Sequence, residues 1–353
     1  MKMKIGVEPH FSLIKAYHGF LMKKIAVRPL FCIALLLLSF SRSYAIDLDR
    51  PDVAAFIKTM ADQHSYDVTT LRDILEQAEI KQSIIDLISK PAERTLTWAE
   101  YRPIFMTRKR VKAGAAFWRE HRQILECISA DTGVPVEILV GIIGVETYFG
   151  RITGGHRVID ALATLTFSYP PRARFFRGEL EQFLLLIREE QMTATDAVGS
   201  YAGAMGRPQF MPSSYRAYAV DSTGDGKRDI WNDWADVAAS VANYFLAHGW
   251  KPGEEIATRA TLSSSWNRSI PENKLRPEET VGTLSKMGVM FSTGLPNDSA
   301  SQLLTFAGAD GAEHWVGFHN FFVITRYNHS TMYALAVHQL GQEIAAEVQR
   351  SAP

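Results

Sequence analysis

The chain has 353 residues, of which 46% are hydrophobic and 22% charged, and its 38 basic and 38 acidic groups cancel. This composition is typical of a globular protein that buries a sizeable core in one to three domains. It excludes a nucleic-acid partner, because no basic patch and no stretch mixing aromatic residues with Arg is present.

The first 45 residues have the layout of a secretory signal peptide. A basic stretch over residues 23–28 precedes an apolar run from Leu30 to Phe40, and Ser43-Tyr44-Ala45 supplies small residues at positions −3 and −1. The apolar run is too short to span a bilayer comfortably. We therefore expect cleavage after Ala45 and a periplasmic protein, while retention of the leader as an anchor stays open.

Cleavage would change the charge and the cysteine content. Residues 1–45 contain seven Lys or Arg and one Glu, so the mature chain keeps 31 basic and 37 acidic groups, a formal charge of −6. A mildly acidic exported protein again argues against nucleic acid. Cys127 would be the only cysteine left, so stability must come from packing. We expect Cys127 to be a small buried hydrophobic residue.

Residues 46–93 predict two or three short helices, because apolar residues recur there at helical spacing. Lys90-Pro91 breaks this pattern. We therefore assign residues 46–93 to an N-terminal helical subdomain and residues 94–353 to the main domain. Within the main domain, Thr97 to Pro103 is expected to cross the surface, and Val111 to Ala130 to form one long amphipathic helix.

The C-terminal third changes character. Residues 255–326 contain short alternating stretches, among them Trp315 to Phe318 and Phe321 to Thr325, separated by Gly, Pro, Asn and Asp. We predict a small β-rich insertion there and a closing helix from about Ser330 to Gln349. The fold class is therefore α+β, mainly α, with an N-terminal helical appendage and a β-rich part near the C-terminus.

A helix that starts at Pro135 carries a carboxyl group in an unusual place. Val136 to Val145 is apolar on every side, which is typical of a helix buried in the middle of a domain. Glu137 suits the helix N-terminus, but Glu146 stands at the opposite end, where the helix dipole disfavours negative charge. Burial and the dipole should both raise its pKa, as a general acid for glycosidic cleavage requires. The alternative is a side chain that simply exits to solvent.

The segment from Gly144 to Arg151 resembles the catalytic motif of the membrane-bound lytic transglycosylase B family. The resemblance spans roughly residues 90–345 in the expected order and implies a lysozyme-like core. It also implies cleavage of the β-1,4 bond between N-acetylmuramic acid and N-acetylglucosamine, which leaves a 1,6-anhydromuramic end. The further matching segments are 160–167 with Tyr169-Pro170, 199–206 with 208–215, 241–245, and 325–328.

The resemblance makes Glu146 the single catalytic residue and implies no cofactor for catalysis. Glu146 would protonate the glycosidic oxygen and then accept the proton of the muramic C6 hydroxyl. No second acid falls in the matched motifs near the site, since Asp160 is interpreted as a helix-start cap. Arg207-Pro208 stands where the family usually has an aromatic or small residue. The residues expected to line the glycan cleft are Tyr101, Ser200, Gln209, Tyr244, Tyr327, Asn328 and Tyr333.

Residues 221–236 follow the opening of an EF-hand loop, with Gly226 at the sharp turn. Position 12 is Asn232, where the standard loop has a bidentate Glu, and the family implies a longer loop closed by a later Asp. We expect a structural Ca²⁺; the alternative is a tight turn of good turn formers. The expected ligands are Asp221, Thr223, Asp225, the carbonyl of Lys227, and Asp236, with Asp233 as the alternative closing residue.

Two other functions stay open at this point. A lysozyme-type hydrolase on the same core would use water in place of the C6 hydroxyl, and only product analysis separates the two. A non-catalytic, calcium-dependent wall-binding protein is disfavoured by the intact set of expected site residues. The expected partners are peptidoglycan glycan strands and proteins of cell-wall synthesis, and the choice between chain ends and interiors stays open.

Overall fold

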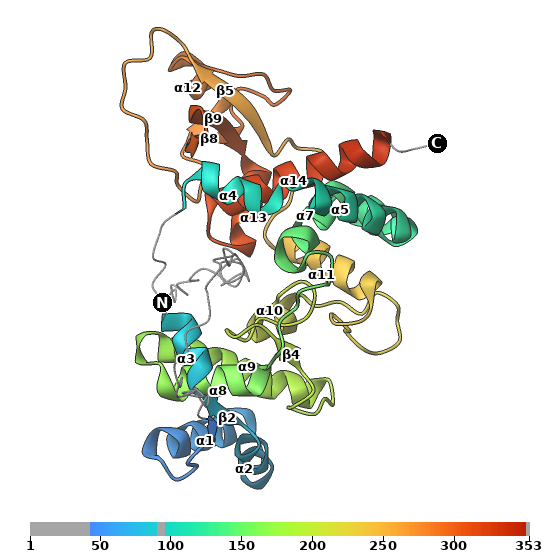
Figure 1. The fold of residues 1–353 in the computed structure, drawn as a ribbon, viewed down its shortest axis with the longest axis vertical. Coiled ribbons are helices and arrows are strands. Elements are labelled where there is room, and N and C mark those ends of the chain that lie inside the picture. Colours follow the sequence, from blue (N-terminus) through green and yellow to red (C-terminus); the bar gives the residue numbers. More distant parts are fainter. Residues whose placement is uncertain (1–42, 90–95, 351–353) are drawn as a thin grey trace, which may run out of the picture. The chain divides into compact units, whose positions relative to one another are not determined.

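The computed structural model describes residues 43–89 and 96–350. The described chain divides into two compact units, and the chain passes from one to the other more than once. Residues 96–153 and 205–350 form the first unit, and residues 43–89 and 154–204 form the second (Figure 1). The predicted leader lies outside the described residues except for its last three, Ser43–Ala45.

The second unit consists of helices and two small antiparallel sheets. Its strands pair as β1 (Ser43–Ala45) with β2 (Glu79–Lys81), and β3 (His156–Arg157) with β4 (Val198–Gly199). The helices are α1 (Pro51–His64), α2 (Val68–Glu76), α3 (Gln82–Ser89), α8 (Val158–Ser168) and α9 (Ala173–Glu189), with a 3-10 turn at Pro170–Arg172. Three helices within residues 46–93 confirm the count expected from the spacing of apolar residues. The contacts group them with residues 154–204, whereas the division at residue 93 stays a prediction.

Asp160 is the polar centre of the second unit. Its side chain has no exposure, and it forms ion pairs with Arg157 and Lys81, both at 2.7 Å. The backbone N–H of Glu79 also donates to it at 2.9 Å. Arg157 occupies the N-cap position of helix α8 without a side-chain cap hydrogen bond, and Asp160 lies inside the first turn, so the prediction that Asp160 caps the helix start is wrong. Asp160 fastens strand β2 to helix α8.

The helices of the first unit are packed around α7 (Val136–Thr147) and α14 (Thr331–Arg350), which lie side by side. A Cβ atom on Gly141 of α7 would lie 2.6 Å from the carbonyl oxygen of Val337 on α14, so only glycine permits this approach. The closing helix is thus confirmed as α14. The other helices of this unit are α4 (Trp98–Phe105), α5 (Arg108–Glu120), α6 (Arg122–Thr132), α10 (Pro212–Tyr218), α11 (Trp234–Ala247), α12 (Val281–Lys286) and α13 (His319–Tyr327).

Three sequence predictions in this unit are wrong. Thr97 to Pro103 does not cross the surface, because Thr97 and Glu100 form a capping box and start helix α4, whose Trp98 is 1% exposed. The long amphipathic helix is broken at His121, which ends α5 and precedes α6. Cys127 lies on the exposed side of α6 and is not a buried hydrophobic residue.

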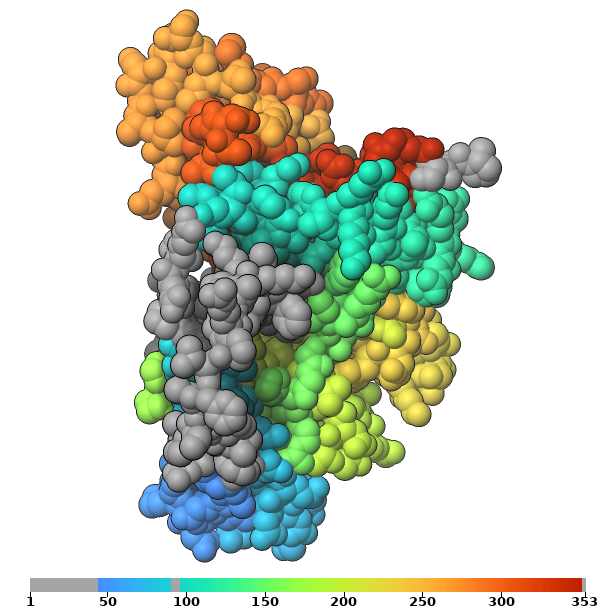
Figure 2. All heavy atoms as spheres, in the orientation of Figure 1, coloured from blue at the N-terminus to red at the C-terminus, as the bar shows by residue number. Residues whose placement is uncertain are grey.

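The β-rich part of the first unit is a five-stranded antiparallel sheet in the order β6-β8-β9-β5-β7. It forms a lobe beside the helices of the same unit (Figure 2). Trp315 to Phe318 is confirmed as strand, but Phe321 to Thr325 belongs to helix α13, so the sheet ends earlier than predicted. The strands are β5 (Ala257–Leu262), β6 (Glu279–Thr280), β7 (Val289–Met290), β8 (Ala300–Gly308) and β9 (Gly311–Phe318).

Candidate active site

Helix α7 ends in three consecutive residues with left-handed backbone. Tyr148, Phe149 and Gly150 have φ values of 51°, 59° and 75°. The first two are not glycine, and such a conformation costs free energy unless the surroundings enforce it. Here the N–H groups of Tyr148 and Phe149 both reach the carbonyl oxygen of Ile143 and close the helix. This tight ending places Glu146 in the last turn.

Glu146 is buried, with 5% of its surface exposed. The hydroxyl of Tyr333 donates a hydrogen bond to Oε1 of Glu146 at 2.5 Å. Desolvation by burial raises the pKa of Glu146 to about 7, and the Tyr333 hydrogen bond opposes this shift. No second carboxyl group and no cation of the described residues contributes to that pKa. Near neutral pH this group therefore exists both as an acid that can give a proton and as a base that can take one.

Three tyrosines surround this carboxyl group, and they come from three different helices. Tyr101 of α4, Tyr327 of α13 and Tyr333 of α14 are all buried. Burial raises the pKa of each, and the charge of Glu146 raises it further. The three hydroxyl groups therefore stay protonated; that of Tyr333 donates to Glu146, and that of Tyr327 donates to the carbonyl oxygen of Pro208 at 2.6 Å. The structure brings together four of the residues predicted from the sequence.

Gln209 lies in a tight reversal of the chain, where Met205 and Phe210 pair through their backbones. Its φ is 55°, an uncommon value for a residue other than glycine. Its Nε2 donates to the carbonyl oxygens of Thr153 at 3.0 Å and Gly206 at 2.8 Å. Its Oε1 is buried and has no hydrogen-bond partner among the described residues. A buried acceptor without a donor is costly unless a ligand supplies one.

Tyr244 and Asn328 stand next to the tyrosine cluster. The hydroxyl of Tyr244 donates to the carbonyl oxygen of Arg326 at 2.6 Å, and its ring stacks on His248 with the centroids 4.1 Å apart. The ring centroids of Tyr244 and Tyr327 are 4.8 Å apart, so Tyr244 supports the cluster from the side. Asn328 follows Tyr327 directly at the end of α13 and is 9% exposed.

Ser200 belongs to the second unit, and its predicted place in the glycan cleft stays a prediction. The serine is 1% exposed. Its Oγ accepts hydrogen bonds from the backbone N–H groups of Ala202 at 3.3 Å and Ala204 at 3.1 Å. These bonds hold the glycine-rich turn after strand β4.

In the predicted metal loop, residues 221–236, carboxylate side chains accept hydrogen bonds from backbone N–H groups of the same loop. Asp221 accepts from the N–H groups of Gly224 and Gly226 at 2.7 and 2.8 Å. Asp236 is 1% exposed and accepts from the N–H groups of Ser222 and Asp229 at 2.7 and 2.8 Å. Within the described ranges, no cluster of three or more His, Cys, Asp or Glu side chains is arranged to hold a metal ion.

The charges around Asp236 nevertheless suit a cation. Burial raises the pKa of Asp236, and the nearby carboxylates of Asp233 and Asp221 raise it further. A hard cation such as Ca²⁺ takes oxygen ligands and relieves this repulsion. Thr223 lies beside Asp221, while Asp225 accepts from the N–H of Lys227 at 2.9 Å. The residue types of the loop therefore fit a calcium ion.

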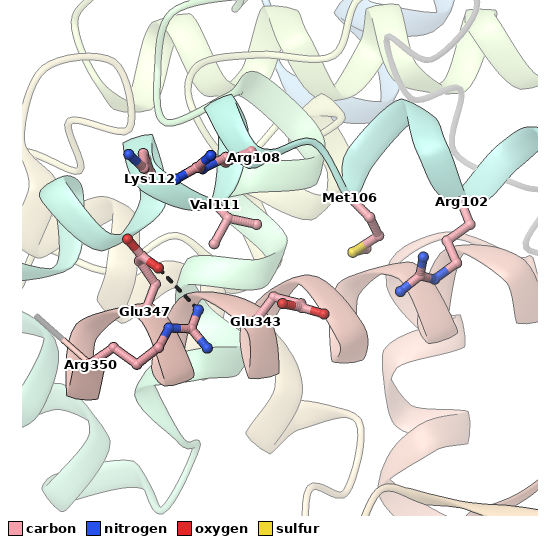
Figure 3. A pocket seen from close by; sticks show the side chains of 8 residues that line it. All are labelled: Arg102, Met106, Arg108, Val111, Lys112, Glu343, Glu347 and Arg350. Atoms are coloured by element: carbon pink, nitrogen blue, oxygen red, sulfur yellow. Dashed lines mark hydrogen bonds and ion pairs between the residues drawn. The ribbon is translucent and has the colours of Figure 1, made fainter.

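A groove of about 450 Å³ lies between helices α4, α5 and α14 (Figure 3). Glu146 does not line it. Two of its charged groups are held by neighbours, since Arg102 donates to Gln339 at 2.7 Å and Arg350 to Glu347 at 3.0 Å. The groove is therefore a feature next to the tyrosine cluster and separate from it. Its lining residues are Arg102, Met106, Arg108, Val111, Lys112, Glu343, Glu347 and Arg350.

Two features of the site could not be found from the sequence. One is the hydrogen bond from Tyr333 to Glu146, whose partners are 187 residues apart. The other is Arg207, which contacts both the end of α7 and the loop 221–236. Its only signal in the sequence is its departure from the family pattern.

Known proteins resemble this chain over most of its length. A family model described as "Transglycosylase SLT domain" matches residues 49–342. The chain is 43% identical over 311 residues to the membrane-bound lytic murein transglycosylase B of Escherichia coli (strain K12), covering 85% of each.

Solved structures agree with that match. The soluble lytic transglycosylase SltB1 from Pseudomonas aeruginosa superposes with a TM-score of 0.81 at 48% identity, covering 86% of this chain and 100% of that one. The Escherichia coli lytic transglycosylase SLT35 in complex with calcium gives 0.77 at 42% identity, covering 86% and 96%. SltB3 from Pseudomonas aeruginosa in complex with NAG-anhNAM-pentapeptide gives 0.75 at 32% identity, covering 83% and 78%. The lysozyme-like, mainly α fold predicted from the sequence is confirmed by these neighbours.

Proposed function

The chain belongs to the transglycosylase SLT domain family and is a peptidoglycan lytic transglycosylase, and from this premise we propose that Glu146 carries its chemistry. Its reaction is cleavage of the β-1,4 bond between N-acetylmuramic acid and N-acetylglucosamine, with formation of a 1,6-anhydromuramic end. One observation carries the assignment: the buried carboxyl group of Glu146 accepts a hydrogen bond from the hydroxyl of Tyr333, and burial raises the pKa of this carboxyl group to about 7.

The proposed reaction uses one carboxyl group twice. In the first step Glu146 gives its proton to the glycosidic oxygen, and the bond from that oxygen to C1 of the muramic residue breaks. In the second step the carboxylate accepts the proton of the C6 hydroxyl, whose oxygen forms the new bond to C1. The proton returns to Glu146 and no water is consumed. In agreement with this outcome, the relative SltB3 was solved with a ligand that contains an anhydro-muramic unit.

The neighbours of Glu146 have distinct proposed roles in this reaction. Tyr333 fixes the orientation of the carboxyl group through its hydrogen bond. Tyr101 offers a protonated hydroxyl and a ring face to the sugars, and Tyr327, whose hydroxyl donates to the carbonyl oxygen of Pro208 at 2.6 Å, offers its ring face. Gln209 offers the buried Oε1 as an acceptor for a sugar hydroxyl or an acetamido N–H. Ser200, Tyr244 and Asn328 are proposed as further residues of the glycan cleft.

The decisive experiment is mass spectrometry of the soluble products from peptidoglycan sacculi treated with purified residues 46–353. Muropeptides lighter by one water, without a reducing muramic end, are the expected result. Reducing ends would instead indicate a lysozyme-type hydrolase. The matched control is Glu146→Gln, which keeps the shape of the side chain and its hydrogen-bond acceptor but cannot supply the proton. Products released by this variant at the normal rate would remove Glu146 from the mechanism.

We further propose that residues 221–236 bind a structural Ca²⁺, which would order the loop and take no part in the chemistry. The support is the oxygen-rich residue set, the mutual repulsion around Asp236, and the relative SLT35 solved in complex with calcium. Melting temperature in the presence of chelator and then of added CaCl₂ tests this. A rise of several degrees on calcium addition is expected, and Asp221→Asn should remove it. Equal melting temperatures in both conditions would rule out the metal.

We propose export to the periplasm as the fate of the chain. Among residues 43–89 and 96–350 no single helix is long and apolar enough to cross a membrane. Cleavage after Ala45 would also remove strand β1. Mass spectrometry of the mature N-terminus in a bacterial host checks this: a start at Ile46 is expected, and an uncut leader would favour an anchored protein. Proteins of cell-wall synthesis remain proposed partners.

A further inference from the structure

Arg207 connects two parts of the first unit that are far apart in the sequence, the end of helix α7 and the loop 221–236. Its backbone carbonyl oxygen accepts a hydrogen bond from Oγ1 of Thr147 at 3.0 Å, and Thr147 directly follows Glu146. Its backbone N–H donates to the carbonyl oxygen of Ile230, within the loop 221–236, at 2.9 Å. One residue thus holds the end of helix α7 on one side and the loop on the other.

The side chain of Arg207 makes a second connection to the same loop. Its Nη1 donates to the carbonyl oxygen of Asn232 at 2.9 Å, and its guanidinium carbon lies 3.8 Å from the ring centroid of Trp234. This is a close cation–π contact, of a kind that contributes on the order of 1 kcal/mol. Trp234 begins helix α11, two residues before Asp236. The flat guanidinium matches both contacts, and an ammonium group would not.

Trp234 in turn touches the turn that ends helix α7. A Cβ atom on Gly150 would lie 2.9 Å from Cη2 of Trp234, so the indole ring closes on the backbone four residues after Glu146. The same ring packs on Phe117, with the centroids 4.6 Å apart. A shift of Trp234 would therefore be transmitted both to Gly150 and, through Arg207, to Thr147.

We propose that Arg207 is a positioning residue that couples the loop 221–236 to Glu146, so that order in the loop sets the rate of bond cleavage. The inference rests on the proposed role of Glu146. A catalytic group must be held to well below 1 Å, since a displacement of that size can lower the rate about 100-fold. Arg207 does not touch the reacting atoms. It holds the residue next to the one that does.

The first test compares Arg207→Ala and Arg207→Lys with Arg259→Ala as the control. Arg259 also lies over an indole ring in the first unit, 4.9 Å from the centroid of Trp315, but its side chain is exposed and it belongs to strand β5. We expect both Arg207 variants to lower kcat about 10-fold with KM within twofold, and Arg259→Ala to keep kcat. A raised KM with unchanged kcat in the Arg207 variants, or no change in either constant, would overturn the proposal.

The second test combines a fluorescence readout with a double-mutant cycle on kcat. The fluorescence of Trp234 is isolated as the difference between each protein and its Trp234→Phe counterpart. When Arg207 is present, the substitution Asp221→Asn in the loop should shift the emission of Trp234 and lower kcat. In the Arg207→Ala background, the same loop substitution should have little further effect on kcat, because the connection is already cut. Fully additive effects would show that Arg207 and the loop act independently and would overturn the coupling.

The two tests separate this inference from the proposed function. If Glu146→Gln stays active, the proposed function fails, while the emission of Trp234 still reports on contact between Arg207 and the loop. If Glu146→Gln is inactive and the Arg207 variants keep full kcat, the function stands and the positioning role fails.

Discussion

The two units each contain a buried carboxyl group, and the two groups have opposite surroundings. Asp160 in the second unit has no exposed surface and faces two cations, Arg157 and Lys81, each at 2.7 Å. Glu146 in the first unit is 5% exposed, and among the described residues its side chain accepts a hydrogen bond from Tyr333 and forms no ion pair. The carboxyl group that is paired with two cations fastens the fold. A charge met by a neutral hydroxyl in a desolvated place titrates near neutral pH and can do chemistry. Burial alone therefore does not identify a catalytic acid. The side chains that contact the carboxyl group determine whether it stabilises the fold or takes part in catalysis.

The largest expected effect separates the two carboxyl groups by activity. Glu146→Gln should lower the rate of muropeptide release about 10³-fold, as expected for loss of a general acid that also serves as the base. The fold should not suffer, because the amide keeps the hydrogen bond from Tyr333 and removes a buried charge. The measurement is product release from sacculi, with circular dichroism as the control for folding. An inactive variant that is also unfolded would leave only a structural role for Glu146.

The corresponding change in the second unit should affect stability and not chemistry. Asp160→Asn removes the nearest anion of Arg157 and Lys81, which then face Glu79 at 3.3 and 3.7 Å, and breaking a buried ion pair in this way costs about 3 kcal/mol. Urea unfolding measures the loss. The matched control is Asp62→Asn in the same unit, which breaks an exposed pair with Lys58 and should leave the urea midpoint nearly unchanged. A loss of turnover per folded molecule in Asp160→Asn would contradict the contrast.

Stability should also depend on pH through Glu146. Its pKa is about 7 in the folded protein and near 4.5 when unfolded. The folded state therefore binds the proton more tightly, and the resulting stabilisation is complete below pH 4.5 and is lost as the pH rises through 7. The difference amounts to about 3 kcal/mol. Relative to Glu146→Gln, the wild type should lose this amount between pH 4.5 and 8. If the free energies of unfolding of the two proteins keep a constant difference across that pH range, the pKa of Glu146 is ordinary.

The sequence predicted the burial of Glu146 because the apolar run before it determines burial locally. It could not predict the partner, since Tyr333 comes from a helix that packs on α7 only in the folded chain. One short segment was misread for a related reason. Phe321 to Thr325 is fully buried, so its apolar residues show no helical period, and the segment was interpreted as a strand. Arg207 had no signal in its own residue type, because every contact that distinguishes it is tertiary.

The smallest expected effect concerns the hydroxyl that distinguishes Glu146 from an isolated buried acid. The Tyr333 hydrogen bond favours the charged carboxylate, so Tyr333→Phe should raise the pKa of Glu146 above about 7. The high-pH limb of the kcat/KM profile should then move to higher pH, because Glu146 must be protonated to start the reaction. Loss of orientation should lower kcat about 10-fold at the optimum.

Tyr101→Phe is the matched control, since the hydroxyl of Tyr101 makes no hydrogen bond to Glu146 among the described contacts. This variant should leave the position of the high-pH limb unchanged. If both variants move the limb equally, burial by the whole tyrosine cluster governs the pKa of Glu146. Movement in Tyr333→Phe alone would show that a single hydroxyl tunes the pKa of Glu146.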